Sequence, residues 1–330
     1  MSHSKITDSA EDSRYTIFPI RNKRIWDHYK DMEAKFWTAE EIDFSQDKHD
    51  FANLSSDEQH FIKYILAFFA VSDVMVNINL TDLLMEMIKS LEAKFAYQFQ
   101  IMIENIHTEV YALQIENVIP DEEERAILLQ SAEKVPCIKQ KTDWMMKWVA
   151  SKEDLPIRLL AQGITEGLFF SSSFCAIFWL KQKKSGSDKR EIMQGLINSN
   201  KLISRDEEDH TKTSIILYEE HGVRIPEETV HAMFMDAFRV EETYVRDSLP
   251  CALIGMNKDL MIRYVQYVAD NLLERFGYRK MFGVENPFPW METLSLENKT
   301  NFFEYRPTEY QKASVMNKTT QDAYTFSDDF

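Results

Sequence analysis

The residues best suited to chemistry are two Glu-x-x-His pairs, in which a carboxylate and an imidazole stand three positions apart. These pairs are Glu104/His107 and Glu207/His210. Since residues three apart share one face of an α-helix, each pair offers two ligands to the same ion. A single acidic residue, Asp73 or Glu166, lies in an apolar run upstream of each pair. Six such ligands on four helices predict a carboxylate-bridged dinuclear metal centre in a helical bundle.

Two other pairs in the sequence have the same or nearly the same spacing. Glu228 and His231 follow Pro226, whereas Asp57 and His60 follow two serines. Both pairs are therefore expected in the first turns of helices, where acidic side chains are exposed and complement the helix dipole. We interpret them as surface or capping residues rather than metal ligands.

The surroundings of the four chosen carboxylates require a counter-charge. Asp73 shares its helix face with Leu66 and Phe69, and Glu166 shares its face with Phe170, so burial is expected. A buried carboxylate without a partner is costly or becomes neutral. Two divalent cations cancel four carboxylate charges when both histidines are neutral.

The types of ligand narrow the choice of metal. Oxygen and imidazole ligands without a thiolate suit iron or manganese better than copper(I) or structural zinc. When both ions are oxidised to the +3 state, an oxo bridge derived from O₂ balances the added charge. In the alternative interpretation the carboxylates pair with arginines, but the helix faces that carry them contain no Lys or Arg.

The elements that position these residues are expected to be helices. Only eight glycines in 330 residues, with apolar residues spaced at the helical period, predict a nearly all-α protein. Ser55 and Glu58 have capping-box spacing, which predicts a helix that starts near residue 55 and continues toward Leu91. Further helices are expected at about 25–37, 92–118, 122–134, 139–150 and 156–181, in a segment ending near 222, and at 226–248 and 258–276.

Composition predicts the organisation and the compartment. No Gly/Ser/Pro-rich linker divides the sequence, so we predict one helical domain over 18–303 between flexible segments at 1–17 and 304–330. A formal charge of −16 argues against a protein that coats nucleic acid. Three cysteines without metal-type spacing, and no evident signal or membrane-spanning segment, predict a cytoplasmic protein outside membranes.

Longer motifs resemble the small, radical-generating subunit of class I ribonucleotide reductase in its eukaryotic form. They include FFAVSD, ENIHTEVYALQIE, TEGLFFSSSF, KLISRDE, GMNKDLM, SLENKTNFFE and a closing SDDF. The likeness runs in order from about Tyr15 to the C-terminus. It implies a ferritin-like helical bundle with a di-metal carboxylate core.

The resemblance also implies the cofactor and its surroundings. The six ligands named above would bind an oxo-bridged di-iron centre, with manganese as the alternative metal. Tyr111, one helical turn beyond His107, matches the tyrosine that becomes a stable radical. Phe170, Phe174 and Ile203 match the apolar pocket that keeps water and reductants away from it. By residue type alone, an aromatic on an apolar helix face is usually a packing residue.

Further residues match a route for the oxidising equivalent. Trp37 matches the tryptophan that relays it, and Asp206 matches the aspartate that links this tryptophan to the metal site. Tyr310 matches the tyrosine that passes the equivalent to the large subunit, into which the tail 311–330 docks. Without the resemblance, Trp37 would be a packing residue, Asp206 would pair with Arg205, and an acidic tail would be solvated.

The sequence departs from close relatives at a few positions. Glu208 and Asp209 stand where Gly-Leu is common, Val74-Met75 replaces a small-residue pair, and 182–194 forms a longer, more basic connection. Helical geometry turns the first of these acids about 100° from the ligand face. The metal ligands are therefore expected to be retained.

The expected function is that of a ribonucleoside-diphosphate reductase small subunit, an enzyme component active only with its large subunit. We expect a homodimer, or a mixed dimer with a paralogue, that uses O₂ to assemble a di-iron and tyrosyl radical cofactor. One rival is a ferritin-like di-iron oxidase, monooxygenase or desaturase, which needs an open substrate channel. The other is an iron-storage protein or an iron-binding structural partner of an active small subunit, which forms no radical.

Overall fold

The computed structural model describes residues 6–7, 14–182, 184–185, 190–249 and 256–291. Met1–Phe288 forms one compact unit, and Pro289–Phe330 forms a second, of which only 289–291 are described. Tyr310, the tail 311–330 and Cys251 lie outside the described residues, so the roles expected of the tail stay predictions.

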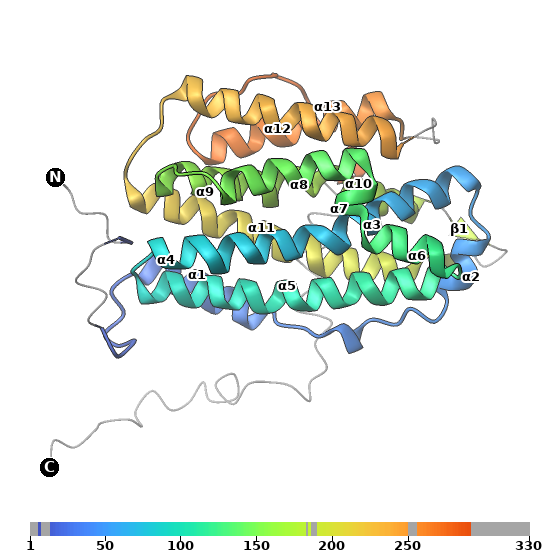
Figure 1. Cartoon of the computed structure of the whole chain (residues 1–330), viewed down its shortest axis with the longest axis horizontal. Helices are drawn as coiled ribbons and strands as arrows, with labels where there is room; N and C mark the ends of the chain where they lie inside the picture. Colours follow the sequence, from blue (N-terminus) through green and yellow to red (C-terminus); the bar gives the residue numbers. More distant parts are fainter. Residues whose placement is uncertain (1–5, 8–13, 183, 186–189, 250–255, 292–330) are drawn as a thin grey trace, which may run out of the picture. The chain divides into compact units, whose positions relative to one another are not determined.

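The compact unit is built almost entirely from helices, as the sequence predicts (Figure 1). The long helices are α1 (Lys23–Ala34), α3 (Ser56–Asn79), α5 (Leu91–Val118), α8 (Pro136–Val149), α9 (Leu155–Ile164), α10 (Ser171–Trp179), α11 (Gln194–His221), α12 (Glu227–Ser248) and α13 (Lys258–Arg275). The shorter elements are η2 (Ala39–Glu41), α2 (Asp47–Ala52), α4 (Met85–Met87), α6 (Glu122–Leu129), α7 (Ser131–Lys134) and η5 (Leu180–Gln182).

The long helices pack side by side around an apolar core. Helix α3 packs against α5 and α8, α11 against α9, α1 against α5, and α12 against α8 and α13. Figure 1 shows α3, α5, α8 and α11 running along the same direction through the middle of the unit. This arrangement is the ferritin-like helical fold expected from the sequence.

Local signals in the sequence set several helix ends. Ser55 and Glu58 form the predicted capping box at the start of α3. The side chain of Ser90 caps α5 by accepting from the backbone N–H of Ala93. Helix α11 ends at Gly222, whose φ of 76° lies in the left-handed region that glycine adopts without a Cβ clash.

Two single turns of π-helix lie within stretches that the sequence predicts as continuous α-helix. One, η3 (Leu80–Leu84), joins α3 to α4, so the helix that starts at Ser56 continues to Met87, close to the predicted end near Leu91. The other, η4 (Thr165–Phe169), lies between α9 and α10. Single π-helical turns are frequent at functional sites. The turn η4 carries Glu166.

Strands also occur where only a polar connection was expected. The short strands β1 (Lys184–Ser185) and β2 (Arg190–Glu191) pair antiparallel, with Lys184 opposite Glu191. They are the sheet that the described residues contain, and they lie in the 182–194 connection.

The stretch Ser56–Met87 is long and apolar enough to cross a membrane by length and composition alone. In the folded protein 61% of its most apolar window is buried against other helices, which is the behaviour of a core helix. Asp73, near the middle of this stretch, is fully buried.

Part of the N-terminal segment contacts this helical unit. Ile6 is buried, and its carbonyl accepts from the backbone N–H of Lys89 at 2.7 Å. Arg14 pairs with the buried carboxylate of Glu92 at 2.8 Å. These contacts hold the described residues of the segment, whose flexibility as a whole stays a prediction.

Candidate metal centre

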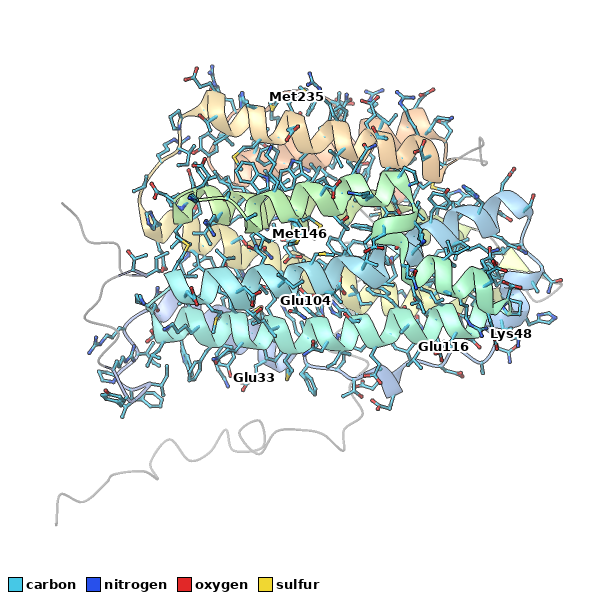
Figure 2. The ribbon with its side chains drawn as sticks, in the orientation of Figure 1. Glu33, Lys48, Glu104, Glu116, Met146 and Met235 are labelled. Carbon is cyan, nitrogen blue, oxygen red and sulfur yellow. The ribbon has the colours of Figure 1, made fainter. Side chains whose placement is uncertain are left out.

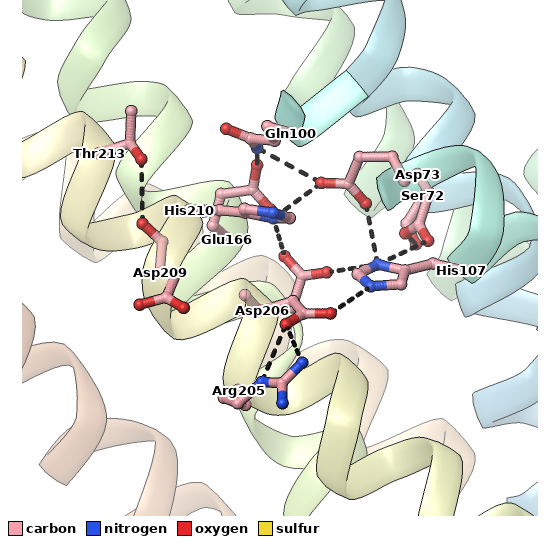
Figure 3. Close-up of polar contacts among 12 residues, drawn as sticks. Ser72, Asp73, Gln100, His107, Glu166, Arg205, Asp206, Asp209, His210 and Thr213 are labelled. Atoms are coloured by element: carbon pink, nitrogen blue, oxygen red, sulfur yellow. Dashed lines mark hydrogen bonds and ion pairs between the residues drawn. The ribbon is translucent and has the colours of Figure 1, made fainter. Parts of the chain in front are cut away.

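The six predicted ligands gather in the interior of the helical unit. They come from α3 (Asp73), α5 (Glu104 and His107), η4 (Glu166) and α11 (Glu207 and His210). Each is at most 2% exposed. Figure 2 labels Glu104 within the helical body, and Figure 3 shows the polar contacts among several of these residues. Segments far apart in the sequence therefore converge on one buried polar cluster.

Glu104 and Glu207 each span the two histidines. Oε2 of Glu104 lies 3.1 Å from Nδ1 of His107, and its Oε1 lies 2.9 Å from Nδ1 of His210. Oε1 of Glu207 lies 3.1 Å from Nδ1 of His107, and its Oε2 lies 3.2 Å from Nδ1 of His210. Both glutamates are thus placed as a bridging carboxylate must be, with one oxygen toward each half of the site.

The other two carboxylates flank this pair and keep an oxygen free. Oδ1 of Asp73 accepts from Ser72 at 3.0 Å, while its Oδ2 has no hydrogen-bond partner and lies 3.8 Å from Nδ1 of His107. Oε1 of Glu166 accepts from Gln100 at 2.7 Å and from Gln162, while its Oε2 has no partner. Buried oxygens without partners are rare in folded proteins, and a metal ion would satisfy both.

The pKa values of the buried carboxylates show that the cluster contains more negative charge than its histidines can balance. Burial, together with the charge of Glu104, raises the pKa of Asp73 and Glu207 well above the usual range and that of Glu166 to about 7. Burial opposes ionisation of Glu104 too, but the charges of His210 and His107 and their hydrogen bonds together outweigh it and lower the Glu104 pKa to about 2. The carboxylates therefore compete for the few positive groups within reach.

Histidine protons supply the positive charge that the cluster contains. Burial disfavours charged imidazole, yet the Glu104 charge raises the pKa of His210 to about 9. Hydrogen bonds to Asp206, Glu104 and Glu207 raise the pKa of His107 above its usual range despite burial. The six ligands form ion pairs with one another, and His107 also pairs with Asp206. Within the described residues, none of the ion pairs of these ligands involves a Lys or Arg.

The geometry fits two cations that share ligands. Ligand atoms of Asp73, Glu104 and His107 lie within 4.8 Å of one another, as do those of Glu104 with Glu166, Glu207 and His210. Glu104 belongs to both groups, so two ions would share its carboxylate. The buried carboxylate and histidine cluster is that of a di-metal centre, and the interpretation with arginine partners is disfavoured.

Tyr111 lies in a buried aromatic pocket beside this cluster. Its ring is 2% exposed and stacks on Phe69 with centroids 4.7 Å apart. Phe69 in turn contacts Phe170 and Phe174, at 5.8 and 5.2 Å. The Tyr111 hydroxyl has no hydrogen-bond partner. Ile203, the third predicted pocket residue, is fully buried on α11.

A hydrogen bond joins Trp37 to Asp206. Nε1 of Trp37 donates to Oδ2 of Asp206 at 2.6 Å, and Nε2 of His107 lies 3.2 Å from the same oxygen. The other carboxylate oxygen, Oδ1, accepts from Arg205 at 2.8 Å. Figure 3 shows Asp206 between His107 and Arg205. The ion pair with Arg205 and the link to the tryptophan therefore coexist.

The competing Glu-x-x-His pairs lie apart from the cluster. Glu228 and Asp57 are exposed. Nε2 of His231 contacts the carbonyl of Arg279 at 3.0 Å, on the outside of α12. A further group, His28, Asp31 and Asp209, also brings ligand atoms together. Both of its carboxylates already contact the Lys35 ammonium at 2.8 Å, so that group has its cation.

Several residues near the cluster were not predicted as site residues. Gln100 and Gln162 donate to Glu166, and Asn79 donates to Gln162. Each glutamine stands four residues before a ligand, on the same helix face, which is the signal that could have revealed them. The sequence placed Phe69 only on the helix face that carries Asp73, and not beside Tyr111. Its contact with Tyr111 depends on how α3 and α5 pack, which residue spacing does not determine.

Comparison with known proteins gives one consistent family. The family model described as ribonucleotide reductase, small chain, matches residues 14–287. The sequence is 46% identical over 317 residues to the ribonucleoside-diphosphate reductase small chain of Nicotiana tabacum, covering 96% of this protein and 94% of that one. It is 45% identical over 319 residues to ribonucleoside-diphosphate reductase subunit M2 of Homo sapiens, covering 96% and 80%.

A solved structure has the same fold. The structure of the ribonucleotide reductase Rnr4 homodimer from Saccharomyces cerevisiae superposes with a TM-score of 0.74 at 32% identity. The match covers 86% of this protein and 90% of that one.

Proposed function

The protein belongs to the ribonucleotide reductase small-chain family, as a small subunit of ribonucleoside-diphosphate reductase, and we propose that it binds two iron ions and forms a radical on Tyr111. A large subunit is its partner in reducing ribonucleotides. The proposed radical is the oxidising equivalent that this partner requires. The spanning positions of Glu104 and Glu207 between the two histidines carry the proposal.

In the proposed centre each residue has a defined part. Glu104 and Glu207 would bridge the two ions. Asp73 with His107 would complete one ion, and Glu166 with His210 would complete the other; the chemistry of these ligands also admits manganese. Bound ferrous ions supply the electrons that reduce O₂ and the power to oxidise a nearby side chain.

The residues around Tyr111 favour a long-lived radical. Burial and the charge of Asp73 raise the pKa of Tyr111 well above its usual range, so the ring starts as a neutral phenol. Phe69 covers one face of the ring, and the hydroxyl has no protein partner that would re-donate a proton. Exclusion of water and reductants would extend the lifetime of the phenoxyl radical.

Burial also argues against the rival enzyme classes. A monooxygenase or desaturase needs a substrate path to its metals, whereas all six proposed ligands are at most 2% exposed. Iron storage gives no reason for a tyrosine in a buried aromatic pocket beside the cluster.

Assembly is the remaining part of the proposal. We propose a homodimer, the assembly in which the yeast relative was solved, with a mixed dimer with a paralogue as the alternative. Residues 311–330, with Tyr310, would dock into the large subunit. Their removal is expected to abolish turnover with the large subunit and to leave the radical intact.

The test of this function is electron paramagnetic resonance after ferrous iron and O₂ are added to the metal-free protein. A tyrosyl signal that is absent in Tyr111→Phe supports the proposal. A wild-type protein that binds iron but gives no radical would favour a structural or storage role.

A further inference from the structure

A fully buried ion pair lies outside the proposed metal centre and has no part in the chemistry so far. Nζ of Lys141 on α8 lies 2.8 Å from Oε2 of Glu241 on α12, and both side chains are 0% exposed. Replacing such a pair with apolar residues is often neutral or stabilising, because removing two charges from water costs so much. Stability alone is therefore a weak reason for this pair.

The lysine ammonium is held in an aromatic cage. Nζ lies 3.5 Å from the centroid of Phe68 and 3.8 Å from that of Tyr244, which are distances for strong cation–π contact. Burial lowers the Lys141 pKa to about 8, while the Glu241 charge opposes that change. The position of this nitrogen is thus fixed from several sides.

The remaining contact of Lys141 points to the metal centre. Nζ donates to the backbone carbonyl of Phe169 at 2.5 Å. Phe169 is the last residue of the π-helical turn η4, which carries Glu166. Where a π-turn meets an α-helix the ladder of backbone hydrogen bonds changes step, so a carbonyl at the junction benefits from another donor.

The segment after the turn is attached to the same pair. Ser172, at the start of α10, donates to Glu241, and the hydroxyl of Ser173 contacts that of Tyr244 at 3.1 Å. On the other side, a Cβ added to Gly167 would meet Leu272 at 3.0 Å, so the turn is packed tightly there as well. The backbone that presents Glu166 is therefore fixed on both sides.

We propose that Lys141 is a positioning residue that holds the π-helical turn through the Phe169 carbonyl and so aims Glu166 at the metal centre. This inference rests on the proposed dinuclear centre. It assigns the lysine to one half of the centre, because Asp73, Glu104 and His107 stand on α3 and α5 and do not depend on the turn. Loss of Lys141 should then affect one ion more than the other.

The test compares two variants of the full-length protein. Lys141→Met with Glu241→Gln removes the donor to Phe169 without leaving a lone buried charge, and glutamine still accepts from Ser172. The matched control is Glu241→Gln alone, which removes the ion pair but keeps Lys141 beside the Phe169 carbonyl. Without the Glu241 charge, burial lowers the pKa of Lys141 further, and the neutral amine still donates to that carbonyl. Manganese(II) binding to the metal-free proteins is followed by the loss of the free-ion paramagnetic signal, and backbone hydrogen exchange is measured without metal.

The expected result is a selective loss. In the double variant one ion should bind as in the wild type and the second about 10- to 100-fold more weakly, the usual effect of losing an outer partner of a ligand. Exchange should rise across 165–174 and stay unchanged across 100–111. The control should resemble the wild type in both measurements. If the double variant does not fold, Lys141→Gln with Glu241→Gln, whose amide stops short of Phe169, replaces it with the same expectation.

Three outcomes would overturn the assignment. They are wild-type binding of both ions by the double variant, unchanged exchange across 165–174, and an equal loss in the control. A wild-type protein that binds no manganese and no iron would instead contradict the proposed function, and the exchange measurement would still test whether Lys141 holds the turn.

Discussion

Trp37 and His107 share one oxygen of a single carboxylate. Nε1 of Trp37 donates to Oδ2 of Asp206 at 2.6 Å, and Nε2 of His107 lies 3.2 Å from it. The rings of Trp37 and His107 are stacked with centroids 5.9 Å apart. A tryptophan beyond the end of α1 is thus linked through the Asp206 carboxylate to a proposed metal ligand on α5.

Trp37→Phe should separate radical formation from turnover. Phenylalanine keeps most of the packing but removes the N–H donor and the readily oxidised indole. We expect a Tyr111 radical of near-normal yield and a loss of turnover with the large subunit of at least about 100-fold, because the route is interrupted. Spin quantification and an assay with the large subunit measure the two effects. Wild-type turnover in this variant would exclude Trp37 from the relay.

The Lys35–Asp209 pair should position Trp37. Lys35 pairs with the buried Asp209 at 2.8 Å, and Arg205 donates to the Lys35 carbonyl at 2.9 Å. Asp209→Asn should reduce turnover roughly tenfold while sparing the radical yield, because Trp37 then loses one support. The matched control is Glu208→Gln. Glu208 pairs with Arg275 at the surface, where an ion pair contributes little. Equal effects of the two substitutions would contradict this role.

Phe69→Leu should shorten the lifetime of the radical. The substitution removes the ring stacked on Tyr111 and opens space in the pocket. We expect the radical to decay about tenfold faster, with a stability loss of about 1 to 2 kcal/mol. Phe61→Leu is the control, since Phe61 is equally buried but contacts Trp179. Decay measured by paramagnetic resonance should change in the first variant alone; the same decay in both would assign the effect to general loosening.

His28 should make the protein less stable in mild acid. Burial lowers its pKa from 6.5 to about 4, with the Asp209 charge opposing. Between these values the unfolded protein takes up a proton that the folded protein does not, so stability falls as pH falls through this window and is unaffected above it. His28→Gln should reduce the loss of unfolding free energy between about pH 7 and about pH 5.5 by about 1 kcal/mol.

Urea unfolding of the metal-free proteins at the two pH values measures this difference. Glutamine retains an N–H donor for the carbonyl of Asp209, to which Nε2 of His28 is bonded at 3.0 Å. An identical pH dependence in variant and wild type would show that another group is responsible.

Much of the site was predictable because helical spacing is regular. Residues three apart must share a face, so the pairing of Glu104 with His107 and of Glu207 with His210 follows from the sequence alone. The capping box at Ser55 depends on local hydrogen bonds and was predicted for the same reason. Apolar neighbours indicated that Asp73 is buried.

The features that were missed depend on tertiary packing. The π-turn around Glu166 inserts no unusual residue into an apolar helical sequence. Its contacts come from Lys141 on α8, and from Leu272 on α13, which packs against Gly167. In the sequence, Lys141 resembles a surface lysine of an amphipathic helix. Its burial depends on the packing of α12 against α8. Local periodicity carries no information on such contacts.

The most direct test of the whole account is anomalous diffraction from crystals of the protein loaded with ferrous iron without O₂. The account predicts two iron peaks, both in contact with Glu104 and Glu207, one beside Asp73 and His107 and the other beside Glu166 and His210. A single peak, no peak, or iron bound elsewhere on the protein would contradict it.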